Sequence, residues 1–185
     1  MTAKIGILPV GQVDAAMLLR LKEKLVQIFP DVTCVVVDAQ LPLPEKAFDK
    51  KRKQYRSEVI LSRIQAYAAK RKRLRSVLGV VDADIFVSEL NFVFGEAACP
   101  GKVALVSLWR LKPEFYGDAS NMALFSARAL KEAVHELGHT LGLKHCQRSS
   151  CVMYFSNSIF DTDRKQGLFC DECSLQVALS INNLG

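Results

Sequence analysis

The chain has 185 residues, of which 50% are hydrophobic and 24% charged, and its formal net charge is +6 at pH 7. This composition is ordinary for a globular protein and excludes the disordered and fibrous classes. The length allows one buried core, so we expect a single compact domain over residues 1–185. Because no stretch reaches the roughly 18 apolar residues of a membrane span, and the N-terminus lacks a leader's cleavage pattern, we expect a cytoplasmic protein without a membrane partner.

The first 40 residues alternate between strand-like and helix-like patterns. Residues 4–10 and 33–38 are rich in apolar and β-branched side chains, which favours buried strands. Between them, residues 14–29 carry leucines at helical spacing, at positions 18, 21 and 25. This order predicts a β-α-β unit whose two strands pair in parallel.

The middle of the chain is less regular. The prolines and charges of residues 41–54 indicate an exposed loop. Residues 57–78 have the pattern of a helix that Ser57 would cap. Residues 79–87 are apolar enough for a central strand.

A hairpin and a long helix follow. Residues 91–97 and 102–111 flank a Cys-Pro-Gly turn, which predicts two antiparallel strands at an edge of the sheet. Residues 120–142 have a long apolar face and end at a glycine, as a helix does. We therefore expect an α/β fold with a mixed, twisted sheet, flanking helices and a long helix near the site, followed by an irregular, loop-rich C-terminal part.

All three histidines of the chain lie within residues 135–145. His135 and His139 are four residues apart, so on a helix their imidazoles stand on one face and can hold one Zn²⁺. Glu136 directly follows the first histidine, where its carboxylate can reach a water on the metal and act as a general base. The pattern His-Glu-x-x-His fixes only three positions and also arises by chance.

Two further residues make the pattern more specific. Gly142 allows the helix to stop in a left-handed conformation, and the turn lets His145 return as a third ligand. Three nitrogens plus water give the open coordination of a catalytic zinc.

The extended pattern resembles that of the metzincin metallopeptidases. Those enzymes place a methionine-containing turn beneath the catalytic zinc, and Met153 resembles that methionine. The cysteines after His145 narrow the resemblance to the archaemetzincins, whose members bind a second, structural zinc through four thiolates. In this chain the matching cysteines are Cys146, Cys151, Cys170 and Cys173. Astacin-like relatives carry a tyrosine two residues after the methionine, where this chain has Phe155.

The spacing of the four cysteines agrees with the structural zinc that the resemblance implies. Two close pairs supply four sulfurs, the number that a closed tetrahedral zinc site requires. Two disulfides are the competing interpretation, and a reducing compartment disfavours them. A zinc at this position would stabilise a segment with little core of its own and would hold the neighbouring His145 in place.

Positive charge gathers between residues 50 and 75, where eleven lysines and arginines accompany only one acidic residue, Glu58. Such a stretch, together with a four-cysteine zinc site, also occurs in nucleic-acid-binding modules. Aromatic side chains for base stacking are scarce there, and Glu136 would have no role. A zinc-holding scaffold without turnover is the other alternative, and a histidine site closed to peptides would favour it.

These observations together predict a zinc-dependent metallopeptidase that acts on peptide or protein substrates as a monomer. We expect two Zn²⁺ per chain: a catalytic zinc on His135, His139 and His145, and a structural zinc on the four cysteines. Residues 1–142 would form the N-terminal subdomain and residues 143–185 the C-terminal one. Arg110 and Tyr116 are weaker candidates for side chains that stabilise the reaction electrostatically.

Overall fold

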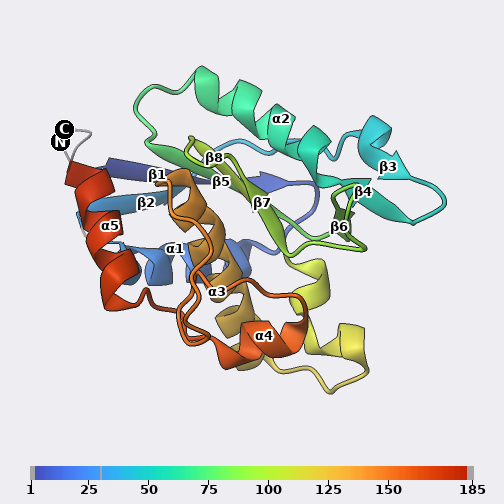
Figure 1. Cartoon of the computed structure of the whole chain (residues 1–185). Coiled ribbons are helices and arrows are strands. Elements are labelled where there is room, and N and C mark those ends of the chain that lie inside the picture. Colours follow the sequence, from blue (N-terminus) through green and yellow to red (C-terminus); the bar gives the residue numbers. More distant parts are fainter. Residues whose placement is uncertain (1–2, 30, 183–185) are drawn as a thin grey trace.

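A five-stranded sheet forms the centre of the computed structural model, which describes residues 3–29 and 31–182 (Figure 1). The strand order is β2-β1-β5-β8-β7. The strands are β1 (Ala3–Val10), β2 (Val32–Val36), β5 (Ser76–Val81), β8 (Val103–Ser107) and β7 (Gly95–Ala97). The first four are parallel, whereas β7 runs antiparallel to β8 at the edge. The predicted mixed sheet with one antiparallel edge strand is confirmed.

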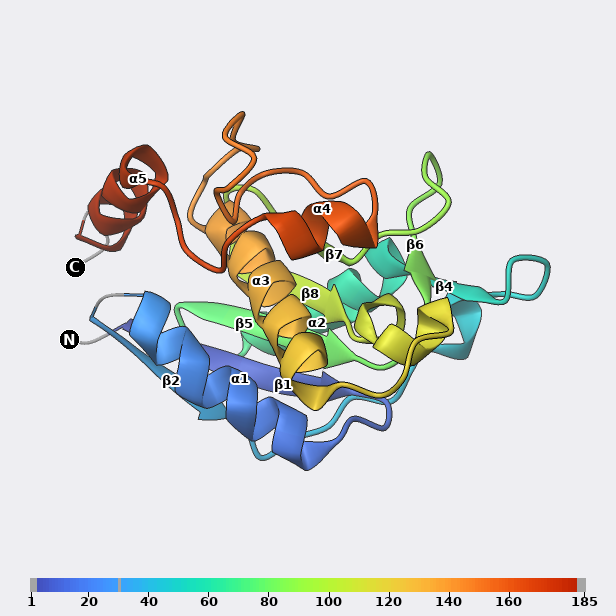
Figure 2. The same cartoon turned by 90° about the horizontal axis from the view of Figure 1, so that it is seen from below.

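Helices cover both faces of this sheet. Figure 2 shows α1 (Ala15–Ile28) and α3 (Met122–Thr140) in front of one face, and α2 (Ser57–Ala69) lies on the other. Each face has its own cluster of buried apolar residues. Because α1 connects two neighbouring parallel strands, the predicted β-α-β opening is also confirmed. The side chain of Asp14 caps α1 by accepting a hydrogen bond from the backbone N–H of Ala16 at 3.1 Å.

The predicted helix over residues 57–78 is too long. The helix α2 ends at Ala69, and a turn leads into β5, all six residues of which are buried. An apolar run of this length fits both a helix and a strand, and burial between two helical layers favours the strand here. Ser57 is not the cap either: Arg56 precedes the helix, and the Ser57 hydroxyl donates to the carbonyl oxygen of Phe86 at 3.0 Å.

The predicted strand over residues 79–87 is broken, and the predicted loop over residues 41–54 is partly ordered. After β5 the chain bends, and β6 (Ile85–Phe86) joins a second, three-stranded sheet with β3 (Phe48–Asp49) and β4 (Gln54–Arg56). The bend carries aspartates that form ion pairs with basic residues farther along the chain; Asp84, for example, pairs with Arg110 at 2.7 Å. The short helical turns are 3-10 segments: Glu45–Ala47, Trp109–Leu111 and Pro113–Tyr116.

The part after Gly142 is loop-rich as predicted but also contains two helices, α4 (Ile159–Arg164) and α5 (Asp171–Asn182). Its buried residues Val152, Met153 and Val177 belong to the same apolar cluster as α1 and α3. Among the described residues, no helix combines the length and apolar character needed to cross a bilayer.

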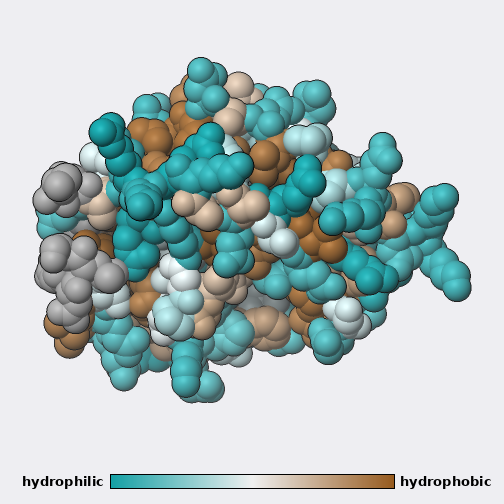
Figure 3. All heavy atoms as spheres, turned by 90° about the horizontal axis from the view of Figure 1, so that it is seen from above, coloured by the Kyte–Doolittle hydropathy of each residue, from teal (hydrophilic) through white to brown (hydrophobic). Residues whose placement is uncertain are grey.

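The basic stretch is divided by the fold. Four of the eleven cations lie in the β3–β4 connection and five follow the end of α2, so the 13-residue helix, about 20 Å long, separates these two groups. The other two, Arg56 and Arg63, lie in β4 and in α2. Figure 3 shows the face over α2, where hydrophilic residues predominate. Some of these cations have structural partners: Arg52 donates to the carbonyl oxygen of Leu90 at 2.7 Å, and Arg71 stacks on Tyr67 at 3.5 Å from its ring centroid.

Candidate active site

The long helix α3 carries the first two histidines and ends at a defined stop. Its end is a Schellman motif, in which the N–H of Leu143 donates to the carbonyl oxygen of Gly138 and that of Gly142 donates to His139. Gly142 has φ of +91°, which explains why glycine stands there. The turn after Gly142 then returns the chain toward the two histidines on the helix.

Hydrogen bonds orient the rings of His135 and His139. The Nδ1 atom of His135 lies 2.8 Å from the carbonyl oxygen of Val152, and that of His139 lies 2.7 Å from that of Leu143. Because a carbonyl only accepts, each Nδ1 is the protonated nitrogen, and each Nε2 keeps a free lone pair. The two Nε2 atoms lie 3.1 Å apart.

The three imidazoles converge. One ring nitrogen from each of His135, His139 and His145 lies within 4.8 Å of the others. Burial lowers the pKa of all three rings, most strongly that of His135, and thereby favours the neutral form that binds metals. Two nitrogens on one zinc stand about 3.3 Å apart, given Zn–N bonds of about 2.0 Å, so the 3.1 Å separation of the Nε2 atoms suits this ion.

Glu136 lies beside this cluster against the edge strand. It is 6% exposed, and a Cβ atom added to Gly95 of β7 would lie 2.5 Å from its Cγ. Glycine at position 95 therefore allows the strand to approach the carboxylate. Burial raises the pKa of Glu136 well above its ordinary value, the nearby Glu132 raises it further, and Lys165 acts in the opposite direction. The buried carboxylate of Glu136 is thus a stronger base than an exposed one would be.

A buried ion pair lies one helical turn before the histidines. The Nζ atom of Lys165 lies 3.0 Å from Oε1 of Glu132, and their side chains are 0% and 3% exposed. Lys165 also donates to the carbonyl oxygen of Tyr154 at 3.3 Å. Sequence reasoning missed this pair. Glu132 could have been suspected from its place on the histidine face of the helix, whereas Lys165 lies in a distant segment without a recognisable pattern.

Met153 packs against α3, the helix that carries His135 and His139. It is fully buried, and its sulfur lies so close to α3 that a Cβ atom on Gly138 would be 2.5 Å from it. Hydrogen bonds hold the backbone around it. The carbonyl oxygen of Val152 accepts from Nδ1 of His135, and that of Met153 accepts from the N–H of Cys146 at 2.9 Å. The turn therefore connects the helix to the cysteine-rich part.

The close approach of Gly138 and Met153 can be tested by substitution. Gly138→Ala is expected to destabilise the fold by about 1–3 kcal/mol, because the added methyl group overpacks a buried contact. Chemical denaturation of both proteins would measure the loss. Gly167→Ala is the control, since its Cβ atom would find its nearest neighbour at 3.9 Å. Equal stability of Gly138→Ala and the parent would contradict the predicted overpacking.

Two adjoining hollows border the histidines. A cavity of about 170 Å³ lies on one side and an open hollow of about 590 Å³ on the other. Both are lined by Val93, Gly95, His135, Glu136 and Phe155. The shared lining places the two hollows next to each other beside the edge strand, and the larger one is open to solvent at the histidines.

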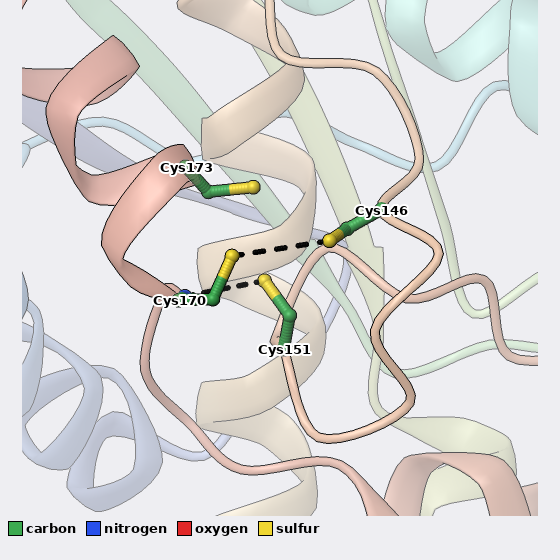
Figure 4. A group of neighbouring side chains, drawn as sticks. All are labelled: Cys146, Cys151, Cys170 and Cys173. Carbon is green, nitrogen blue, oxygen red and sulfur yellow. Dashed lines mark hydrogen bonds between the residues drawn. The ribbon is translucent and has the colours of Figure 1, made fainter.

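The four predicted cysteines also come together, at the start of α5 (Figure 4). Their sulfurs lie within 4.8 Å of one another, and those of Cys146 and Cys170 are 3.9 Å apart. Sulfurs on one tetrahedral zinc stand about 3.8 Å apart, given Zn–S bonds of about 2.3 Å. All six cysteines are free thiols, so the disulfide alternative has no support.

Backbone groups surround these sulfurs. The N–H of Cys170 donates to Sγ of Cys151 at 3.4 Å, and that of Arg148 donates to Sγ of Cys146 at 3.5 Å. Such bonds stabilise thiolates on a metal. Burial raises the pKa of Cys151 and Cys173, so metal binding here must release protons. The donor set and its spacing fit zinc.

The weaker candidates lie elsewhere. Arg110 makes a two-pronged ion pair with Asp84, and the Tyr116 hydroxyl donates to the Arg110 carbonyl oxygen at 2.8 Å. Neither residue lines the two hollows at the histidines. Their hydrogen bonds indicate a structural role.

Comparison with known proteins assigns this chain to a family. Residues 12–178 match peptidase family M54. Archaemetzincin from Methanocaldococcus jannaschii is 44% identical over 173 residues, which cover 94% of this chain and 92% of that protein. Archaemetzincin from Pyrococcus abyssi is 41% identical over 176 residues, which cover 94% and 93%.

Comparison with solved structures gives the same family. The crystal structure of archaemetzincin from Archaeoglobus fulgidus, complexed with malonate, has a TM-score of 0.78 at 38% identity and covers 94% of this chain and 99% of that chain. A zinc-dependent peptidase from Methanocorpusculum labreanum has a TM-score of 0.84 at 27% identity, with 94% and 99% covered. The chain therefore belongs to peptidase family M54, the archaemetzincins, and is a zinc metallopeptidase.

Proposed function

We propose that this peptidase uses His135, His139 and His145 to hold its catalytic zinc and Glu136 as the general base. The observation that carries the proposal is the convergence of three neutral imidazole nitrogens beside a buried carboxyl group, in a cleft open to peptides. His145 is exposed on the cleft side. This openness favours an enzyme over the zinc-holding scaffold.

The residues divide the chemistry between them. Zinc, when bound, would polarise the scissile carbonyl and make water easier to deprotonate. Glu136 takes the proton from the attacking water and returns it to the leaving amine. The raised pKa of Glu136 serves the first step, because a carboxylate whose conjugate acid has a higher pKa is a stronger base toward the attacking water.

The edge strand is the proposed substrate platform. Among the described residues, β7 pairs with β8 on one side only. An extended peptide can add to the free side through main-chain hydrogen bonds. Since Gly95 of this strand touches Glu136, the peptide backbone would lie next to the catalytic carboxylate.

We further propose a second, structural zinc on Cys146, Cys151, Cys170 and Cys173. Its role would be to fix the segment that begins directly after His145. The C-terminal residues share a core cluster with α3, which supports treating residues 1–142 and 143–185 as one catalytic unit.

The test is hydrolysis of a diverse peptide library by the zinc-loaded protein, beside Glu136→Ala. We expect products from the parent and a rate lower by about 10²- to 10⁴-fold in the variant, the usual contribution of general acid–base catalysis. Zinc content should not change, because Glu136 is not among the proposed ligands.

Glu23→Ala is the matched control, since Glu23 is exposed on α1 and should not affect the rate. Two results would contradict the proposal: a zinc-loaded parent that cuts no peptide, or a Glu136→Ala variant that cuts as fast as the parent.

A further inference from the structure

The smaller cavity beside the histidines has aromatic walls. Its volume is about 170 Å³, and it opens next to His135 and Glu136. The aromatic rings that line it belong to Phe92, Phe94 and Phe155, and the first two pack edge to face with centroids 5.2 Å apart. An apolar cavity of about 150 Å³ holds one benzene molecule. The space therefore suits a single aromatic ring.

A carboxylate also lines this cavity. Glu132 is one of its lining residues, and its charge is balanced by the buried ammonium of Lys165. Among the described residues, all donors to this carboxylate meet the same oxygen, Oε1: Lys165 at 3.0 Å, Thr162 at 2.7 Å and Ser156 at 3.4 Å. The other oxygen, Oε2, receives no donor from the described part of the chain.

Only 3% of the Glu132 side chain is exposed, and we assign this exposure to Oε2. Buried side-chain atoms without a partner occur at Arg75, Asp82, Glu96 and Ser126 in the described residues, and Oε2 of Glu132 is not among them. Because Glu132 lines the cavity and Oε2 has neither a donor nor a place among these sealed atoms, we infer that Oε2 faces the cavity. The cavity thus offers an aromatic enclosure with a charged acceptor.

We propose that this cavity binds a tyrosine side chain of the peptide substrate, with its hydroxyl donating to Oε2 of Glu132. The inference rests on the proposed function, because it assigns a preference to the same cleft. Phenylalanine would fill the space but leave the carboxylate oxygen unpaired. A lysine or arginine of the substrate would bring a second cation close to the ammonium of Lys165, which already neutralises the carboxylate.

Matched peptides test the preference. Four peptides identical except for Tyr, Phe, Lys or Leu at one position, next to a bond that the parent cuts, would be compared by kcat/KM. We expect the tyrosine peptide to exceed the phenylalanine peptide by about tenfold to a hundredfold, as for a hydrogen bond to a charged group. Equal values for Tyr and Phe, or a higher value for Lys, would overturn the proposal.

A double variant then tests the assigned acceptor. Glu132→Leu combined with Lys165→Met removes both buried charges together, so neither is left unpaired. The ratio of Tyr to Phe turnover should fall to about one, and thermal unfolding would verify that the variant is folded. An unchanged ratio in the folded double variant would exclude Glu132 as the acceptor.

Binding separates this proposal from the catalytic one. Titration of the same Tyr and Phe peptides into zinc-loaded Glu136→Gln, which keeps the size of this cavity-lining side chain, measures the preference without turnover. Suppose that the parent cuts no peptide, whereas the Tyr peptide binds the variant at least tenfold more tightly than the Phe peptide. The proposed mechanism then fails and the cavity assignment stands. If the two peptides bind equally, the assignment fails whatever the rate of hydrolysis.

Discussion

Cys151→Ser is expected to remove the proposed structural zinc, which lowers the zinc content by one ion per chain, and to loosen the C-terminal part. Cys151 is buried, and its sulfur belongs to the four-sulfur cluster that ties the loop after His145 to the start of α5. Structural zinc contributes about 10 kcal/mol or more in isolated peptides. Because the C-terminal part here also packs on α3, we expect a smaller loss, on the order of 5 kcal/mol of unfolding free energy.

Metal analysis and chemical denaturation would measure both effects. Peptide hydrolysis should fall as well, although the histidines are intact, because Cys146 directly follows His145 and is hydrogen-bonded to Met153. Cys99→Ser provides the control: this residue is exposed and lies outside the cluster, and serine keeps a donor for the Leu143 carbonyl oxygen, so the variant should keep the parent's zinc content and stability. Two zinc ions and unchanged unfolding in Cys151→Ser would refute the structural role.

The parts of the molecule that sequence reasoning predicted are those specified by local patterns. The helix α1 follows from apolar residues at helical spacing after Asp14, and the end of α3 follows from Gly142, which accepts a positive φ. The meeting of His135 and His139 follows from helical geometry alone. Each of these inferences needs only a few neighbouring residues.

The parts that it missed depend on partners far along the chain. The run after Ala69 fits a helix until the neighbouring strands β1 and β8 make residues 76–81 a buried strand. The break at Asp84 is explained by Arg110, with which it pairs. In the same way, neither the cavity of about 170 Å³ nor its charged lining is visible in the sequence, because three separate segments form it.

The buried pair of Glu132 and Lys165 leads to the second large prediction. Lys165→Met is expected to destabilise the protein by about 3–5 kcal/mol, because it leaves the Glu132 carboxylate buried without its cation. It also removes the donor to the Tyr154 carbonyl oxygen, next to Met153. Urea denaturation of the zinc-loaded proteins would measure the difference.

The double variant with Glu132→Leu separates charge from packing. Replacing both members of a buried ion pair by apolar residues is often neutral or stabilising, so the double variant should regain most of the lost stability. Lys144→Met, a change at an exposed lysine, should have no comparable effect. If the single variant were as stable as the parent, the buried carboxylate of Glu132 would not depend on Lys165. If instead the double variant were as unstable as the single one, the loss would come from the missing contacts to Thr162 and Tyr154, and the pair would act through packing.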